Sequence, residues 1–294
     1  MEPICFDGQA NLNLVLWGDP QVWEREPKRL ARLQTACETV ASAGGRLDVL
    51  GVLGDVAEFG TKKQYVSAAA ALRVAAQKAA HIFCVTGNHD VRVRNYRKQI
   101  SAFHAFLSEV PHAHVNPGDR YYFSETVNGY PVICLGADRA AFEASYLSEK
   151  QLVWLEARLF EAEKTGVPAF VFNHQALKRT NGLPVTWGGY GTWRGSVGRQ
   201  SDRLRAILER HGVVFYCTGH LHYGISAYNY ERSGKLHMLS APTVGVENHG
   251  PNALPGQGYV LNVYEDRVRI RGADFINGVF LDASLPGGEK TVLF

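Results

Sequence analysis

Short apolar runs, each closed by a glycine or an asparagine, recur along much of the chain. Apolar runs of this length between turn signals are typical of buried β-strands in a mainly parallel or mixed sheet. The runs are LNLVLWG before Asp19, LDVLGVLG before Asp55, HIFCVTG before Asn88, PAFVFN before His174 and VVFYCTG before His220. Each run therefore predicts one strand.

Between these runs, apolar residues recur at the three- and four-residue spacing of an amphipathic helix. The clearest set is Leu30, Leu33, Cys37 and Val40, which share one helix face. Further helices are expected from Lys62 to Ala80, from Ser148 to Lys164 after a Ser-x-x-Gln start, and over residues 199–211. Strand and helix patterns alternate, which indicates the α/β class.

The C-terminal segment has a different pattern. KLHMLSAPT, GQGYVLNVY and DRVRIRGADF are strand-like and joined by glycine or acidic turns, with Asp266 at one expected hairpin. This pattern predicts a meander that completes a second sheet. Two sheets packed face to face with helices outside fit a chain of 294 residues, and no shift in composition divides it, so one domain over residues 1–294 is expected.

Composition and charge exclude several classes of partner. Lys and Arg together number 31 against 28 for Asp and Glu, which is too small an excess for a nucleic-acid groove or a membrane patch. No apolar stretch approaches the ~18 residues that a membrane span needs. The acidic N-terminal segment does not resemble a signal peptide, so we expect a cytoplasmic protein. The oligomeric state has no signal in the sequence.

The five cysteines lack CxxC spacing, and Cys84, Cys134 and Cys217 lie inside apolar runs. This placement is typical of small buried side chains in a reducing compartment. We therefore assign the cysteines no chemistry.

Every predicted strand of the first set ends at a residue that can bind a metal ion. The strand ends are Gly18-Asp19-Pro20-Gln21, Gly54-Asp55, Gly87-Asn88-His89-Asp90, Asn173-His174 and Gly219-His220-Leu221-His222. In open α/β sheets, side chains beyond the carboxyl ends of the strands converge on one site. Carboxylate, amide and imidazole donors together suit Mn²⁺, Fe²⁺ or Zn²⁺ better than Ca²⁺.

These motifs, in this order, resemble those of the calcineurin-like metallophosphoesterase family, from about Asp19 to His222. The resemblance implies a four-layer α-β-β-α sandwich of two mixed β-sheets flanked by helices. It also implies two divalent metal ions: Asp55 would bridge both, Asp19 and His222 would bind the first, and Asn88, His174 and His220 the second. His89, at the position that contacts the phosphoryl group, would protonate the leaving oxygen as general acid, and Asn88 would share substrate binding with it.

One position departs from the commonest family pattern. The first strand is followed by Asp19-Pro20-Gln21, where the family usually has Asp-x-His. Gln21 offers an amide oxygen to the first ion in place of an imidazole nitrogen, a harder and weaker donor that favours Mn²⁺ or Fe²⁺ over Zn²⁺. The alternative is that Gln21 turns away and hydrogen-bonds the backbone.

The expected reaction is hydrolysis of a phosphate mono- or diester by a hydroxide that bridges two cations. Small-molecule and nucleotide phosphoesters both fit, because the shared site dictates chemistry and not substrate. Two alternatives remain open: a scaffold or binding protein that keeps the fold, for which Gln21 is the favourable feature, and a nuclease, for which no basic face is visible.

Other residues with suitable side chains lie outside the metal set. Asp90 adjoins His89, and this adjacency alone suggests that it orients the imidazole. His112 and His114 follow a proline and no strand, Asp138 lacks a second donor nearby and Ser196 lacks a nucleophile-elbow motif, so these four are interpreted as structural or surface residues.

The segment from Lys178 to Gly198 is rich in glycine, aromatic residues and arginine. Its notable side chains are Arg179, Trp187, Tyr190, Trp193 and Arg194. Aromatic faces with arginine would suit an aryl or nucleobase group that carries phosphate. A glycine-rich surface loop held by buried tryptophan is an equal alternative.

Overall fold

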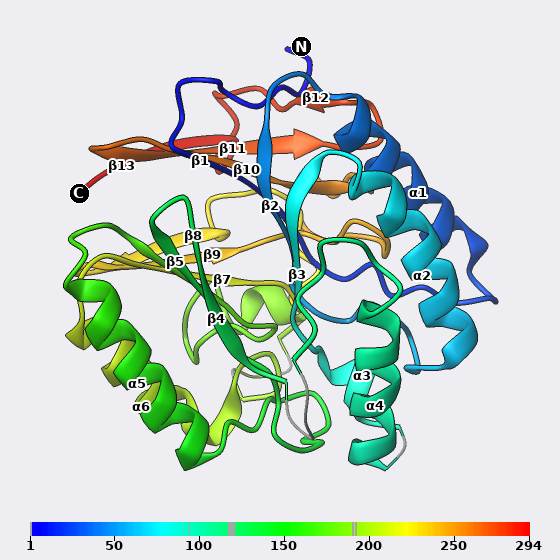
Figure 1. The fold of residues 1–294 in the computed structure, drawn as a ribbon, viewed down its shortest axis with the longest axis horizontal. Coiled ribbons are helices and arrows are strands. Elements are labelled where there is room, and N and C mark those ends of the chain that lie inside the picture. The colour runs from blue at the N-terminus through cyan, green and yellow to red at the C-terminus, as the bar shows by residue number, and fades with distance from the viewer. Residues whose placement is uncertain (1, 94, 117–120, 190, 192) are drawn as a thin grey trace.

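The computed structural model describes residues 2–93, 95–116, 121–189, 191 and 193–294. Within these residues the strands form two mixed sheets, and Figure 1 shows helices on the outer side of each. This arrangement confirms the α/β class and the α-β-β-α layering expected from the sequence. The expectation of one domain over residues 1–294 stays a prediction.

The first sheet holds strands from both ends of the chain, in the spatial order β12-β11-β10-β1-β2-β3, with β13 paired to β11. Its strands are β1 (Leu12–Trp17), β2 (Leu47–Val52), β3 (Ala79–Cys84), β10 (Gln257–Val263), β11 (Arg267–Asp274), β12 (Val279–Phe280) and β13 (Glu289–Leu293). β1, β2 and β3 run parallel, with Leu14 opposite Val49 and Val49 opposite His81. Their carboxyl ends therefore lie at the same edge of the sheet.

The second sheet has the order β4-β5-β6-β7-β9-β8. Its strands are β4 (Phe123–Val127), β5 (Tyr130–Cys134), β6 (Ala169–Phe172), β7 (Val214–Thr218), β8 (Tyr230–Ser233) and β9 (Leu236–Ser240). β5, β6, β7 and β9 are parallel neighbours, so their carboxyl ends also share one edge.

The C-terminal strands do not complete one sheet, which corrects the expectation of a single meander. β9 runs parallel to β7 in the second sheet, whereas β10 runs antiparallel to β1 in the first, with Leu12 opposite Val263. β10 is buried along its whole length because it fills the position beside β1 that β2 leaves open. The expected hairpin at Asp266 is present, since β10 and β11 pair antiparallel on either side of it.

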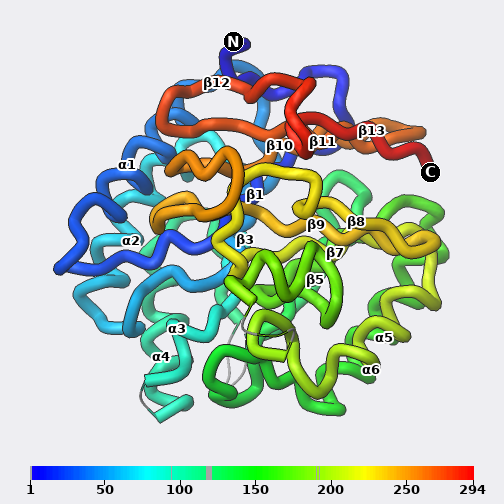
Figure 2. The backbone as a smooth tube through the Cα atoms, turned by 180° about the vertical axis from the view of Figure 1, so that it is seen from behind, coloured from blue at the N-terminus to red at the C-terminus, as the bar shows by residue number. Residues whose placement is uncertain are grey.

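Helices cover the outer face of each sheet, as Figures 1 and 2 show. They are α1 (Pro27–Ser42), α2 (Lys62–Ala75), α3 (Asn88–Val91), α4 (Tyr96–Leu107), α5 (Glu149–Glu163) and α6 (Ser201–Arg210), with short 3-10 turns at Val185–Trp187 and Gly198–Gln200. The Ser148 side chain accepts a hydrogen bond from the Gln151 backbone N–H, which confirms the predicted start of α5. α2 ends at Ala75, earlier than expected, because Ala79 already pairs with Leu47 in the sheet.

The largest hydrophobic core lies between the two sheets and extends to α1, α2 and α4. Phe172 of β6 packs so closely against Gly51 of β2 that a Cβ at Gly51 would lie 2.9 Å from the phenyl ring. A second core joins the outer face of β5, β6 and β7 to α5 and α6 through Leu155 and Ile207. No helix among the described residues is both long and apolar enough to cross a membrane. The tight packing of sheet on sheet holds the two sets of strand ends in register.

Candidate metal centre

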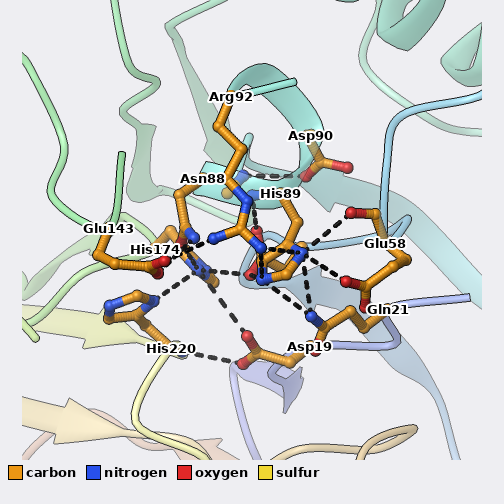
Figure 3. Close-up of polar contacts among 12 residues, drawn as sticks. Asp19, Gln21, Glu58, Asn88, His89, Asp90, Arg92, Glu143, His174 and His220 are labelled. Atoms are coloured by element: carbon orange, nitrogen blue, oxygen red, sulfur yellow. Dashed lines mark hydrogen bonds and ion pairs between the residues drawn. The ribbon is translucent and has the colours of Figure 1, made fainter. Parts of the chain in front are cut away.

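The strand ends of both sheets meet at one place and bring the predicted metal donors together (Figure 3). Asp19, Asp55 and Asn88 follow β1, β2 and β3 of the first sheet. His174 follows β6 of the second sheet, and His220 and His222 follow β7. The site therefore exists only because the two sheets pack face to face.

The centre of the cluster is made of Asp55, His174 and His220, whose ligand atoms lie within 4.8 Å of one another. His174 Nε2 is 3.2 Å from Asp55 Oδ2 and 3.1 Å from His220 Nδ1. It is also 3.1 Å from the Asn88 side-chain oxygen. All of these side chains are buried, so four donors face one small volume that water barely reaches.

Buried histidine and carboxylate partners shift each other's proton affinity strongly. Burial would lower the pKa of His174, but the charges of Asp55 and Asp19 outweigh it and raise that pKa to about 9. Burial and the neighbouring His174 hold the pKa of His220 well below its ordinary value. Burial would raise the pKa of Asp55, yet His174 and His89 keep it below its usual range. The carboxylate is therefore ionised, and a bound cation would replace the proton on His174.

Hydrogen bonds from outside the cluster orient its donors. His174 Nδ1 lies 2.6 Å from the Leu53 carbonyl oxygen, and since a carbonyl only accepts, Nδ1 carries the hydrogen and Nε2 points inward. The His220 backbone N–H donates to Asp19 Oδ2 at 2.9 Å, and His222 Nε2 lies 3.0 Å from Asp19 Oδ1. Bonds of this kind fix which atom of a ligand faces a metal.

The backbone at the site is strained at residues other than glycine. The residues with positive φ here are Asp19 at 48°, Gln21 at 44°, Asp55 at 49°, His220 at 70° and His222 at 48°. Such a conformation costs of the order of ~1–3 kcal/mol per residue and persists only where the surrounding structure imposes it. Strain at this many donor residues is typical of a functional site.

Two glycines give the donors room. A Cβ at Gly87 would lie 2.0 Å from Asp55 Oδ1, and one at Gly219 would lie 2.7 Å from Asp19 Oδ2. No larger residue fits either position without moving a carboxylate.

His89 lies beside the cluster and is mostly covered. Its backbone N–H donates to Asp55 Oδ1 at 2.8 Å, and its Nδ1 lies 2.9 Å from the Glu58 carbonyl oxygen and 3.2 Å from the Glu58 carboxylate. Burial would lower the pKa of His89, but Asp55 and Glu58 raise it above its ordinary value even against the charge of Arg92. The two carboxylates therefore favour the protonated form of His89.

Asp90 does not orient His89, which corrects that hypothesis. Its carboxylate accepts hydrogen bonds from the backbone N–H groups of Val56, Ala57 and Gly87 and from the Tyr65 hydroxyl. Burial and the charge of Asp55 raise the pKa of Asp90 to about 7. Asp90 ties the loop after β2 to the loop after β3, and Glu58 is the residue that holds His89.

Arg92 and Glu143 also belong to the site, although no sequence motif predicts them. Glu143 accepts from Asn88 Nδ2 at 2.9 Å and from Arg92 Nη1 at 2.6 Å (Figure 3). The other arm of Arg92 lies against His89, with Nη2 2.9 Å from Nε2 and 3.0 Å from Nδ1. Arg92 follows His89 by three residues, a spacing that could have suggested it. Glu143 comes from a distant loop, for which no local signal exists.

Gln21 is buried at the site, and its side-chain oxygen has no hydrogen-bond partner. Its Nε2 lies 3.0 and 3.1 Å from the two ring nitrogens of His89. A buried amide oxygen without a partner is costly unless something else binds it. The unpaired oxygen of Gln21 and the cluster of Asp55, His174 and His220 are both donors that suit divalent cations, so the donor set supports metal binding.

The segment from Lys178 to Gly198 borders the site, and its residues differ in role. The Trp187 ring stacks on His220, with 4.4 Å between centroids, and packs with Leu221 and Tyr223. Trp187 thus supports a ligand, which favours the structural alternative for this side chain. Trp193 and Arg194 are exposed, and Tyr190 lies outside the described residues.

The residues interpreted as structural lie in settings that agree with that interpretation. Asp138 accepts from the Ser148 backbone at the start of α5, and Ser196 donates to the Trp193 carbonyl within its own loop. His112 is exposed, and His114 stacks on Phe123 with 3.7 Å between ring centroids. All five cysteines are free, and four of them are buried: Cys37, Cys84, Cys134 and Cys217.

A fold of two mixed sheets between helices, with metal donors at the strand ends, defines a metal-dependent phosphoesterase architecture. The family model of the calcineurin-like phosphoesterases matches residues 12–224, and the chain belongs to that family. Membership implies divalent metal ions.

Solved structures with this fold include two phosphatases. A dimetal phosphatase from Danio rerio superposes with a TM-score of 0.71 at 14% identity, over 97% of this chain and 99% of that one. A purple acid phosphatase from yellow lupin (Lupinus luteus) seeds gives 0.66 at 12% identity, over 98% of this chain and 55% of that one. At these identities the likeness concerns the fold. No curated protein matches the chain in sequence.

Proposed function

We propose that this protein hydrolyses a phosphate mono- or diester, with a small molecule or a nucleotide as substrate, at a dinuclear metal centre. The observation that carries the proposal is the buried cluster of Asp55, His174 and His220 with Asn88 beside it, donors from both sheets within hydrogen-bond distance of one another. For stability alone, apolar residues would serve better than buried polar donors directed at one point. The donors therefore indicate a ligand.

The donors divide into two sets around Asp55. Asp19 and His222, 3.0 Å apart, would hold one ion together with the free oxygen of Gln21. Asn88, His174 and His220 would hold the other, and Asp55 would serve both because its carboxylate has two anionic oxygens to share. Two bound ions activate a water molecule and neutralise the phosphoryl oxygens. Manganese or iron suits the mixed oxygen and nitrogen donors better than zinc does.

His89 supplies the proton that the leaving oxygen needs. It has the reach, because its ring borders the cluster, and Asp55 and Glu58 raise its pKa above the ordinary value, which favours the protonated ring. Glu58 holds the ring in place through Nδ1, and Nε2, beside Arg92 Nη2 and Gln21 Nε2, is the nitrogen that would face the substrate. Arg92, fixed by Glu143, presents its second arm at the same place and would hold a phosphoryl oxygen.

The test compares metal content and turnover in three proteins. The parent, purified without chelator, should hold about two divalent ions per chain and hydrolyse p-nitrophenyl phosphate or its bis-ester with Mn²⁺ added. Asp55→Ala should lose both ions, whereas His89→Ala should keep them and lose about 10²- to 10⁴-fold in rate. Absence of transition metal together with absence of turnover would refute the enzymatic proposal. Equal metal loss in both variants would refute the division of roles.

No specific observation favours the two alternatives. A scaffold has no use for strained donor residues, and the sequence excess of three positive charges gives a nuclease no evident groove. The family and the donor set both favour phosphoester hydrolysis.

A further inference from the structure

A groove lies near the candidate metal centre. The two loops that form the groove both contact residues of that centre. The groove has a volume of about 540 Å³ and lies between residues 139–146 and residues 193–200. Glu143 in the first loop binds Asn88 and Arg92. The Arg194 carbonyl oxygen in the second loop lies 3.4 Å from His220 Nε2. The two loops that form the groove therefore also contact residues of the candidate metal centre.

The groove carries the positive charge of two arginines. Arg139 and Arg199 line it, and neither has a carboxylate partner among the residues that the structure describes. The nearest acidic side chain of the same loop, Glu143, is already bound to Arg92 and Asn88. Unpaired guanidinium groups in a hollow favour an anion with several oxygens, such as a phosphate.

Arg139 is held in a position suited to such a ligand. Its guanidinium carbon lies 3.7 Å from the centroid of the Tyr146 ring. Stacking uses the flat face of a guanidinium and leaves the N–H groups at its edge free to donate. Tyr146 therefore fixes Arg139 without competing for its hydrogen bonds.

The groove also contains an exposed aromatic ring. The Trp193 side chain lines it and is 45% exposed. An indole left open to solvent next to arginines is a stacking surface for a flat ring, and every nucleobase has such a face. The groove therefore offers an aromatic ring for a nucleobase and arginines for a phosphate.

We infer that this groove binds the leaving group of the substrate, and that the preferred substrate is a nucleotide with a second phosphate besides the one that reacts. The base stacks on Trp193, and the second phosphate binds Arg139 and Arg199. The inference rests on the proposed function, since it assigns the part of the phosphoester that is not transferred.

Three substrates separate the two contributions. Adenosine 3′,5′-bisphosphate has the base and a second phosphate, adenosine 5′-monophosphate has the base alone, and p-nitrophenyl phosphate has neither adenine nor a second phosphate. The parent should prefer them in that order of kcat/KM. Arg139→Ala/Arg199→Ala should raise KM for the bisphosphate about 10- to 100-fold, the loss that one or two charge-assisted hydrogen bonds cause, and leave p-nitrophenyl phosphate unchanged. Trp193→Ala should raise KM for both adenosine substrates.

The matched control is Arg158→Ala, which removes an exposed positive charge from α5 outside the groove. An increase in KM equal to that of the groove variants would show a general charge effect and overturn the inference. So would a parent that does not distinguish bisphosphate from monophosphate.

Calorimetric titration of adenosine 3′,5′-bisphosphate into the metal-depleted parent and the metal-depleted double variant tests the groove without turnover. A parent that turns over no ester but binds the bisphosphate, with affinity lost in the double variant, refutes the proposed function and supports the groove. A parent that hydrolyses p-nitrophenyl phosphate but binds the bisphosphate no better than the double variant does refutes the groove alone.

Discussion

Replacing Glu143 by alanine should weaken the second metal site from outside it. Glu143 Oε2 accepts from Asn88 Nδ2 at 2.9 Å, which forces the Asn88 oxygen toward His174. Without the carboxylate, the Asn88 amide can rotate and present a nitrogen, which cannot bind a cation. Arg92 loses its 2.6 Å partner as well, so a positive charge is released near the site.

The expected loss of metal affinity follows from the contacts of Glu143. The lost bond joins a mostly covered carboxylate, 18% exposed, to a buried amide. Loss of a partner that orients a metal ligand typically costs about 10- to 100-fold in metal affinity. We expect that loss for one ion only, because the contacts of Asp19 with His222 do not involve Glu143.

Calorimetric titration with Mn²⁺ measures this prediction. Glu143→Gln should fall between parent and alanine variant, since its amide oxygen can still accept from Asn88. Glu161→Ala, which breaks the exposed ion pair with Lys164, is the control and should titrate like the parent. An alanine variant that binds two ions as tightly as the parent would show that Glu143 does not orient Asn88.

Three further predictions concern other parts of the molecule. Gln21→His should increase the affinity for the first ion and raise Zn²⁺ occupancy, because an imidazole nitrogen would replace the free amide oxygen of Gln21. Gln21→Ala should empty that site first. Identical calorimetric isotherms for the parent and the two variants would exclude coordination by Gln21. Trp187→Ala should lower metal affinity and not only alter substrate preference, since its ring supports His220; unchanged metal content would return Trp187 to substrate recognition. Burial lowers the pKa of His237 from 6.5 to about 4, so the unfolded chain binds this proton at higher pH than the folded one, and the stability is complete above pH 6.5 and lost as the pH falls toward 4. The contribution of His237 to the loss of unfolding free energy between pH 7 and pH 5 should be about 2 kcal/mol, so the loss should be smaller in His237→Gln. Urea unfolding at the two pH values measures it, and equal losses in both proteins would contradict the prediction.

The sequence by itself determined the local elements and the donors that follow them. β1, β2, β3, β6 and β7 lie where the apolar runs predicted, because short runs between turn residues, rich in β-branched and aromatic side chains, favour buried strands. The donors Asp19, Asp55 and Asn88 were identified for the same reason, since each follows its strand directly and belongs to an ordered set of motifs. Family membership followed from that order.

Only the tertiary structure decided which segments meet. β10 joined the first sheet beside β1 and β9 joined the second beside β7, because strand pairing depends on non-local burial that a strand-like pattern does not specify. Asp90 adjoins His89 in sequence but binds the loop after β2, while Glu58 and Glu143 reach the site from other segments. A side chain's neighbours are set by where its backbone is held, and that position depends on the packing of the whole fold.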